Sequence, residues 1–204
     1  PTQLALDAAQ YEATRMLTLR IQQTCHRSGA VILFSSLDPA FSAARIVAEV
    51  ARCMADREER VLVVDALSID HSTMPAVNLL GIEERGDTPG LAEYLAGGDH
   101  SMTSLIQPTS CPGVDAIASG NVPFDREAMA SSALTELLKS CRQSYTMVLV
   151  HGPVAVWAAD LQMLTARADG VVLAASRAAS CDPRAREVVE DLLNLGAPII
   201  GVVM

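Results

Sequence analysis

Short, continuously apolar segments recur along the chain, and stretches with the spacing of amphipathic helices separate most of them. The run Val61–Asp65 lacks the polar alternation of a strand with one wet face, so it is typical of a parallel strand covered on both faces. Parallel neighbours need a long crossover connection, which a helix supplies. The sequence therefore predicts an α/β fold, a mainly parallel, doubly wound sheet in three layers, α/β/α. The predicted strands are 30–35, 61–65, 114–118, 147–150, 170–175 and 198–203.

One domain, 1–204, accommodates this pattern, because 204 residues are enough to bury a substantial single core. Half of the residues are hydrophobic but only 3% are aromatic, so we expect a core of Ala, Val, Leu and Ile. Residues 1–28 precede the first strand and are predicted to form a helix, which is a candidate oligomerisation element.

The charge balance limits the classes of partner. A formal net charge of −9 and a pI near 4.8 argue against nucleic acid and against an anionic membrane surface. No apolar run reaches the roughly 18 residues of a membrane span, so we expect a soluble, cytoplasmic domain. The five cysteines and four histidines show neither C-x-x-C nor H-x-x-x-H spacing, so neither a disulfide framework nor a metal site is predicted.

The segment 31–55 has the pattern of an apolar strand, a tight turn and an amphipathic helix, which is the layout of a phosphate-binding P-loop. In a sheet of this class, ligands bind at the carboxyl ends of the strands. The candidate site is therefore formed by the turn after Ser36, the residues after Asp65 and the residues after Val150.

In their order and spacing, these segments resemble the bacterial tyrosine kinase (BY-kinase) domain of polysaccharide co-polymerase systems. That family is a branch of the deviant Walker P-loop ATPases, which also include cell-division and partition ATPases. The resemblance covers nearly the whole chain, and it implies a P-loop NTPase-like fold with a nucleotide site at the turn after the first strand. It rests on the segments 12–15, 31–36, 60–65, 89–97, 105–107, 118–120, 137–138, 168–173 and 201–203.

The family's P-loop pattern, Pro-Gly-Glu-Gly-Lys-Ser/Thr, falls on residues 39–44, where the groups that hold phosphate are missing. Glycines let backbone N–H groups surround the phosphates, the lysine offsets their charge, and the hydroxyl binds magnesium. Lys139 is the only lysine in the chain and lies on a distant predicted helix, so no shifted alignment supplies another. The pattern keeps Pro39, but Ala40 and Ser42 replace the glycines, Ala43 replaces the lysine and Ala44 replaces the hydroxyl residue.

Two further residues flank this pattern. Arg45 is the nearest cation, but it comes one helix position too late and is predicted to face solvent. Asp38 and Pro39 repeat the helix-start signal of Asp182 and Pro183. We therefore predict that Asp38 caps a helix that begins at Pro39, which places a carboxylate in the anion site and repels phosphate.

The resemblance also implies three acids near magnesium, two after the second strand and one at the end of a later strand. Asp65 matches the first position, but Leu67 and His151 occupy the other two. One carboxylate of three makes a poor magnesium site. We expect Asp65 to cap the loop that follows it and His151 to be a local hydrogen-bonding residue.

Members of the family form rings through a Glu-x-x-Arg-x-x-Arg motif on the N-terminal helix. Glu12 and Arg15 match its first two positions, whereas Thr18 occupies the third. We therefore expect a homodimer through this helix rather than a full ring.

These features favour a catalytically inactive relative of the BY-kinases, a pseudokinase that acts as an adaptor or regulator in exopolysaccharide or capsule biosynthesis and export. Its expected partner is a membrane polysaccharide co-polymerase or an active kinase homologue, which would hold it at the inner face of the membrane. No catalytic residue, cofactor or metal is expected. The alternative is a divergent ATPase or tyrosine kinase that binds ATP and magnesium at a non-standard site formed by Arg45, Asp65 and His151. A positioning protein like the partition ATPases is disfavoured by the missing lysine.

Overall fold

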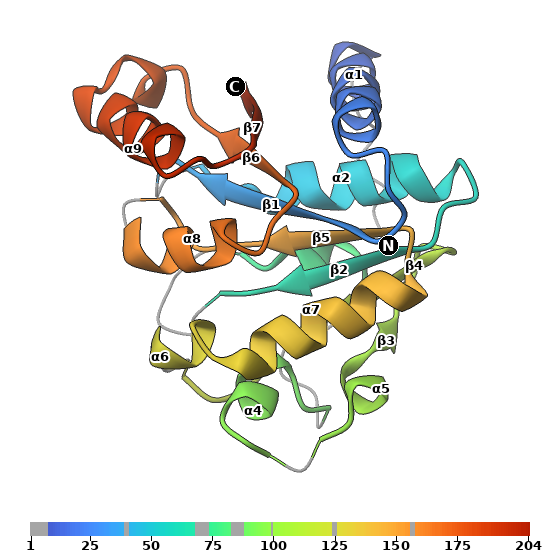
Figure 1. Cartoon of the computed structure of the whole chain (residues 1–204). Helices are drawn as coiled ribbons and strands as arrows, with labels where there is room; N and C mark the ends of the chain where they lie inside the picture. The colour runs from blue at the N-terminus through green and yellow to red at the C-terminus, as the bar shows by residue number, and fades with distance from the viewer. Residues whose placement is uncertain are drawn as a thin grey trace.

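The computed structural model describes residues 8–38, 41–67, 74–82, 88–98, 100–123, 126–155 and 158–204. Its strands form one seven-stranded sheet in the order β3-β4-β2-β5-β1-β6-β7 (Figure 1). Neighbouring strands are parallel except β3 and β4, which are antiparallel. The predicted mainly parallel α/β fold is confirmed. The strands are β1 (Ala30–Ser36), β2 (Val61–Asp65), β3 (Gln107–Pro108), β4 (Val114–Ile117), β5 (Met147–His151), β6 (Gly170–Ala174) and β7 (Ile199–Val203).

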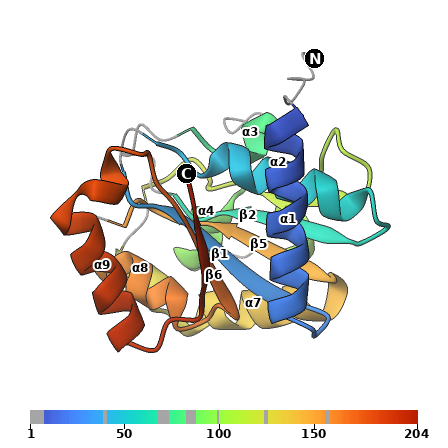
Figure 2. The same ribbon diagram turned by 90° about the horizontal axis from the view of Figure 1, so that it is seen from above.

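Helices cover both faces of this sheet, and α1 lies outside α2 at the surface of the molecule (Figures 1 and 2). The predicted single helix over 127–142 is instead two helices, because the Ser131 side chain accepts a hydrogen bond from Leu134 N and starts a new one. The helices are α1 (Ala8–Thr24), α2 (Ala44–Ala55), α3 (Ala76–Leu79), α4 (Leu91–Leu95), α5 (Met102–Leu105), α6 (Arg126–Met129), α7 (Ser132–Ser144), α8 (Ala158–Thr165) and α9 (Pro183–Asn194), with a 3-10 turn at Ala179–Cys181.

The continuous apolar runs of the sequence follow from a core on each side of the sheet. Along β1, Val31 and Leu33 face the cluster that contains residues of α7, α8 and α9, whereas Ile32 and Phe34 face the cluster that contains residues of α2. Every residue of β1, β2, β5 and β6 is buried. None of the helices formed by the described residues is both long and apolar enough to cross a bilayer.

The strand order reverses at β1 and β5. The chain leaves β1 through α2 to reach β2, but β5 lies between these two strands. It then leaves β5 through α8 to reach β6 on the other side of β1. The carboxyl ends of β1 and β5 are therefore where a sheet of this class binds ligands.

Candidate functional site

The turn after β1 leads into α2, which begins at Ala44 and not at Pro39. The predicted start at Pro39 with Asp38 as its N-cap is wrong, because Phe41, Ser42 and Ala43 are not helical. The Ser42 hydroxyl accepts the hydrogen bond from Ala44 N at 3.1 Å. Pro39 and Ala40 lie outside the described residues.

Asp38 points to the connection after β6. Its Oδ2 accepts a hydrogen bond of 2.6 Å from Ser176 Oγ, which itself accepts one from Ala179 N. Leu37 N donates to Ala174 O at 2.7 Å, so the turn is attached to the end of β6 at two points. The Asp38 carboxylate is thus hydrogen-bonded to the connection after β6.

The described residues at the start of α2 supply neither the cation nor the magnesium-binding hydroxyl of the P-loop pattern. Ala43 and Ala44, the positions of the lysine and the hydroxyl residue in the P-loop pattern, are buried methyl groups in the core cluster beside α2. Arg45 is exposed, as predicted. Its Nε donates to Glu49 Oε1 at 2.7 Å and its Nη2 to Gln10 Oε1 at 3.1 Å, so the guanidinium is directed toward α1.

Asp65 and His151 lie side by side at the carboxyl ends of β2 and β5, where they are partners in the strand register. His151 Nδ1 is 2.7 Å from Asp65 Oδ1, and both side chains are at most 1% exposed. As a carboxylate, Asp65 can only accept, so the imidazole donates through Nδ1. His151 is a hydrogen-bonding residue, but its partner is not local as predicted: Asp65 lies 86 positions earlier in the chain, on the neighbouring strand β2.

Asp65 also caps α3. Its Oδ1 accepts a hydrogen bond from Ala76 N at 3.1 Å, and its Oδ2 accepts one from Val77 N at 2.8 Å. The predicted capping role is therefore confirmed, and both carboxylate oxygens are engaged within the protein.

Magnesium, which the P-loop pattern implies together with ATP, does not fit these residues. The imidazole N–H of His151 is directed at the one carboxylate that remains, and Leu67 is a buried apolar side chain. The described residues contain no group of three or more His, Cys, Asp and Glu side chains able to hold a metal ion.

Backbone pairing with the last residues of β1 continues past the end of β5. Gly152 N donates to Phe34 O at 2.8 Å and Ala155 N donates to Ser36 O at 2.7 Å. Ser35 Oγ donates to Pro153 O at 2.5 Å. The two segments thus remain hydrogen-bonded at the point of strand-order reversal. Sequence reasoning missed this closure, although Gly152 and Pro153 directly after His151 marked a turn.

Comparison with known proteins shows which proteins the chain is similar to. No protein-family model matches the chain. Two relatives are named as tyrosine-protein kinases: EpsB of Ralstonia solanacearum, 28% identical over 199 residues, and YwqD of Bacillus subtilis, 26% identical over 174 residues. The chain resembles bacterial tyrosine kinases. These alignments cover 97% and 85% of the chain, but 26% of EpsB and 70% of YwqD.

Solved BY-kinase domains share the fold. The VpsO kinase domain superposes with a TM-score of 0.76 at 21% identity, covering 96% of this chain and 95% of that one. The kinase domain of Escherichia coli ETK gives a TM-score of 0.78 at 21% identity, covering 95% and 74%. The cell-division ATPase MinD of Pyrococcus furiosus superposes with a TM-score of 0.68 at 21% identity, and the alignment covers 86% of this chain and 71% of MinD.

The segment 89–97, which contributes to the BY-kinase resemblance, is hydrogen-bonded to the loop after β4. Glu93 Oε2 accepts from Gly90 N at 2.8 Å and Oε1 accepts from Asn121 N at 2.6 Å. Burial raises the pKa of Glu93, but the backbone hydrogen bonds from Asn121 and Gly90 outweigh it, and the net pKa is below its ordinary value. A Cβ on Gly90 would lie 2.3 Å from Gly120 N, so the two loops meet backbone to backbone. The sequence pattern indicated that this segment is characteristic, but it did not predict the contact with the loop after β4.

The residues that match the BY-kinase oligomerisation motif in part lie on α1. Glu12 and Arg15 are exposed, with Arg15 Nη1 3.4 Å from Glu12 Oε2 within the helix. Thr18 is buried, and its hydroxyl donates to Thr14 O at 2.9 Å. A long cation at that position would have to be buried, so only the first two motif positions are available at the surface.

Proposed function

We propose that this chain is a catalytically inactive, BY-kinase-like domain, and that it acts as an adaptor or regulator in exopolysaccharide or capsule biosynthesis and export. The observation that carries the proposal is the hydrogen bond between His151 and Asp65. It engages the remaining acid of the candidate site inside the fold, with an imidazole where the resemblance expects a second carboxylate. Phosphoryl transfer depends on metal ions and cations to spread the charge of the phosphates, and the buried Ala43 and Ala44 supply neither.

A direct test is a phosphotransfer assay. The purified chain is incubated with radiolabelled ATP and magnesium, and both phosphate release and autophosphorylation are measured, with the YwqD kinase as positive control. We expect no turnover above a blank without protein. Turnover that disappears in the Asp65→Ala and His151→Ala variants, both checked for folding, would contradict the proposal.

The alternative is a divergent ATPase or tyrosine kinase that uses Arg45, Asp65 and His151. Asp65 and His151 do meet, but both are buried, and Arg45 is held by Glu49 and Gln10 on the side of α1. The exposed Arg45 separates the two functions in the cell. Arg45→Gln in the full-length protein leaves polysaccharide output unchanged under the adaptor proposal and abolishes it under the enzyme alternative.

The proposed partner is a membrane polysaccharide co-polymerase or an active kinase homologue, which would hold the domain at the inner face of the membrane. The exposed Glu12 and Arg15 on α1 are the candidate contact residues, and the same surface is the candidate for a homodimer. Co-purification with a defined co-polymerase should be lost in a Glu12→Arg/Arg15→Glu variant and retained in Lys139→Glu, a charge reversal on α7. Equal recovery of the partner with both variants would exclude α1 as the contact.

A further inference from the structure

Helix α1 is attached to the rest of the domain by a small apolar contact. Of its 17 residues only Thr18 and Ile21 are buried, whereas seven of the 12 residues of α2 are. Ile21 is enclosed in the core cluster beside α2, and Leu17 packs against that cluster from outside. Figures 1 and 2 show α1 at the surface of the molecule, outside α2. The apolar burial that holds α1 is therefore supplied mainly by one side chain, Ile21.

Polar contacts add to this attachment, and they follow both helices in the same order. Three side-chain hydrogen bonds join residues that are 35 positions apart: Arg45 Nη2 to Gln10 Oε1 at 3.1 Å, Thr14 Oγ1 to Glu49 Oε2 at 3.3 Å, and Arg57 Nη1 to Gln22 Oε1 at 2.9 Å. Hydrogen bonds of this kind replace bonds to water, so each adds only modestly to stability. The contact between α1 and α2 is thus long but weak for its length.

The same interval of 35 positions places Cys53 opposite Thr18, between the second and the third of these hydrogen bonds. Both residues are buried: Thr18 is 0% exposed and Cys53 is 9% exposed. Cys53 also follows Glu49 by four residues on α2, so both lie on the side of that helix that faces α1. The Cys53 thiol is therefore covered by α1, and its reactivity reports whether α1 is in place.

We propose that α1 is a releasable strap, which leaves α2 as one unit while the seven-stranded sheet stays folded. Local opening has a low free energy where few buried apolar contacts and many solvent-facing hydrogen bonds hold a segment. Release uncovers the side of α2 that carries Glu49 and Cys53. It also separates Gln10 from Arg45, the residue that follows the turn after β1. The strap thus connects the helix proposed above as a partner contact with the edge of the sheet that carries the candidate site.

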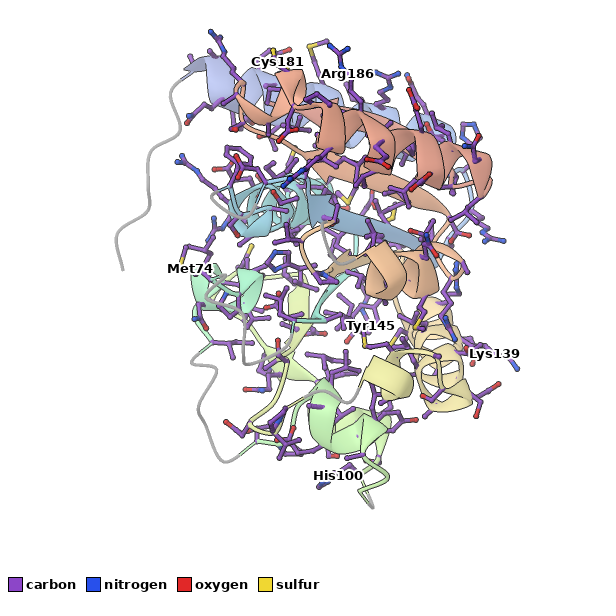
Figure 3. The ribbon with its side chains drawn as sticks, turned by 90° about the vertical axis from the view of Figure 1, so that its left-hand side faces the viewer. Met74, His100, Lys139, Tyr145, Cys181 and Arg186 are labelled. Atoms are coloured by element: carbon purple, nitrogen blue, oxygen red, sulfur yellow. The ribbon has the colours of Figure 1, made fainter. Side chains whose placement is uncertain are left out.

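The test is alkylation of the native cysteines with iodoacetamide in the whole chain, at urea concentrations below the unfolding transition, read out by mass spectrometry of the peptides. Cys53 reports release of α1, and the fully buried Cys141 on α7 reports global unfolding. Cys181, at the surface in Figure 3, gives the unprotected rate. We expect Cys53 to react far more slowly than Cys181. Its rate should depend less steeply on urea than that of Cys141, because release exposes less surface than global unfolding.

Two core substitutions separate release of α1 from global unfolding. Ile21→Ala weakens the attachment of α1 and should speed the labelling of Cys53 roughly thirtyfold or more. Leu137→Ala, in the core beneath α7, lowers global stability, so it should speed the labelling of Cys141 and leave that of Cys53 unchanged. The matched control is Met16→Ala on the exposed side of α1, which should change neither rate. The inference concerns the stability of the fold and does not depend on the absence of kinase activity.

Three results would overturn the proposal. If Cys53 reacts as fast as Cys181 in the native chain, α1 does not cover it. If Cys53 and Cys141 share one urea dependence, or if Leu137→Ala speeds both, α1 leaves only when the whole domain unfolds. The urea series needs only the native chain, so it decides between strap and global unfolding even where a variant does not fold.

Discussion

Replacing His151 with leucine would leave Asp65 fully buried and without its imidazole donor. The carboxylate would retain the hydrogen bonds from Ala76 N and Val77 N, so it would lose one of three donors. Hydrogen bonds to charged groups contribute about 1.5–3 kcal/mol, and a buried charged group that loses a donor also costs desolvation free energy. We therefore expect His151→Leu to lower the free energy of unfolding by about 2–4 kcal/mol.

The matched variant is His151→Asn, whose amide N–H can donate where the imidazole Nδ1 does. His151→Asn keeps a hydrogen-bond donor but leaves a small void, whereas His151→Leu fills the space but has no donor. Comparing the two variants therefore separates the effect of the lost donor from the effect of the lost volume. For a chain of this size, each kcal/mol corresponds to about 2–4 °C in melting temperature. His151→Leu should therefore melt roughly 5–15 °C lower, and His151→Asn should fall by less than half as much. The assay is urea unfolding followed by circular dichroism, with thermal melts as a second measure.

A double-mutant cycle with Asp65→Asn sharpens the test. In the native chain this substitution removes a charged acceptor and should destabilise. In the H151L background it removes an unpaired buried charge, so part of the lost stability should return, with a coupling of about 1–3 kcal/mol. Equal effects of His151→Leu and His151→Asn, together with additive effects of the two sites, would refute the interaction between Asp65 and His151.

Three further outcomes are expected. Gly90→Ala should lower the free energy of unfolding by at least about 2 kcal/mol, because its Cβ would meet the loop after β4, whereas Gly201→Ala, with nothing within 4 Å, should change urea unfolding little. The pKa of Glu93 is lowered in the folded protein, so its stabilising contribution is full above its unfolded pKa and is lost as pH falls through the folded value. The stability difference between native chain and Glu93→Gln should shrink with acidification, and a difference independent of pH would contradict this. Burial raises the pKa of Cys141 to about 12, so it should resist thiol reagents at pH values where the exposed Cys181 reacts, as mass spectrometry of labelled peptides can check.

The main strands could be predicted because residues buried on both faces leave an uninterrupted apolar run. The break at Ser131 was missed because the apolar spacing of α7 continues backward through it, and only the capping hydrogen bond to Leu134 N separates the helices. The two-residue β3 is too short to leave any pattern in the sequence. The start of α2 was misplaced for a similar reason. Asp38 with Pro39 resembles a helix start, but the turn is held by contacts to Ala174 and Ser176, about 140 residues later in the chain.

The sequence predicted that the turn after β1, Asp65 and His151 lie at the carboxyl ends of the strands, but the contacts of these residues depend on the tertiary fold and not on a local pattern. Asp65 and His151 were each expected to make local hydrogen bonds. That they bond to each other depends on β5 lying between β1 and β2, which brings together residues separated by 86 positions. The sequence alone showed that Ala43 and Ala44 lack the phosphate-binding lysine and the magnesium-binding hydroxyl of the P-loop pattern. A methyl group cannot replace either of them in any fold.

The central claim, that this site does not bind a nucleotide, is tested most directly by isothermal titration of the purified chain with ATP and magnesium. We predict no binding heat at ligand concentrations well above those that saturate an active kinase domain measured in parallel. Magnesium-dependent ATP binding with a micromolar dissociation constant, abolished by a substitution at Asp65 that preserves the fold, would contradict the claim.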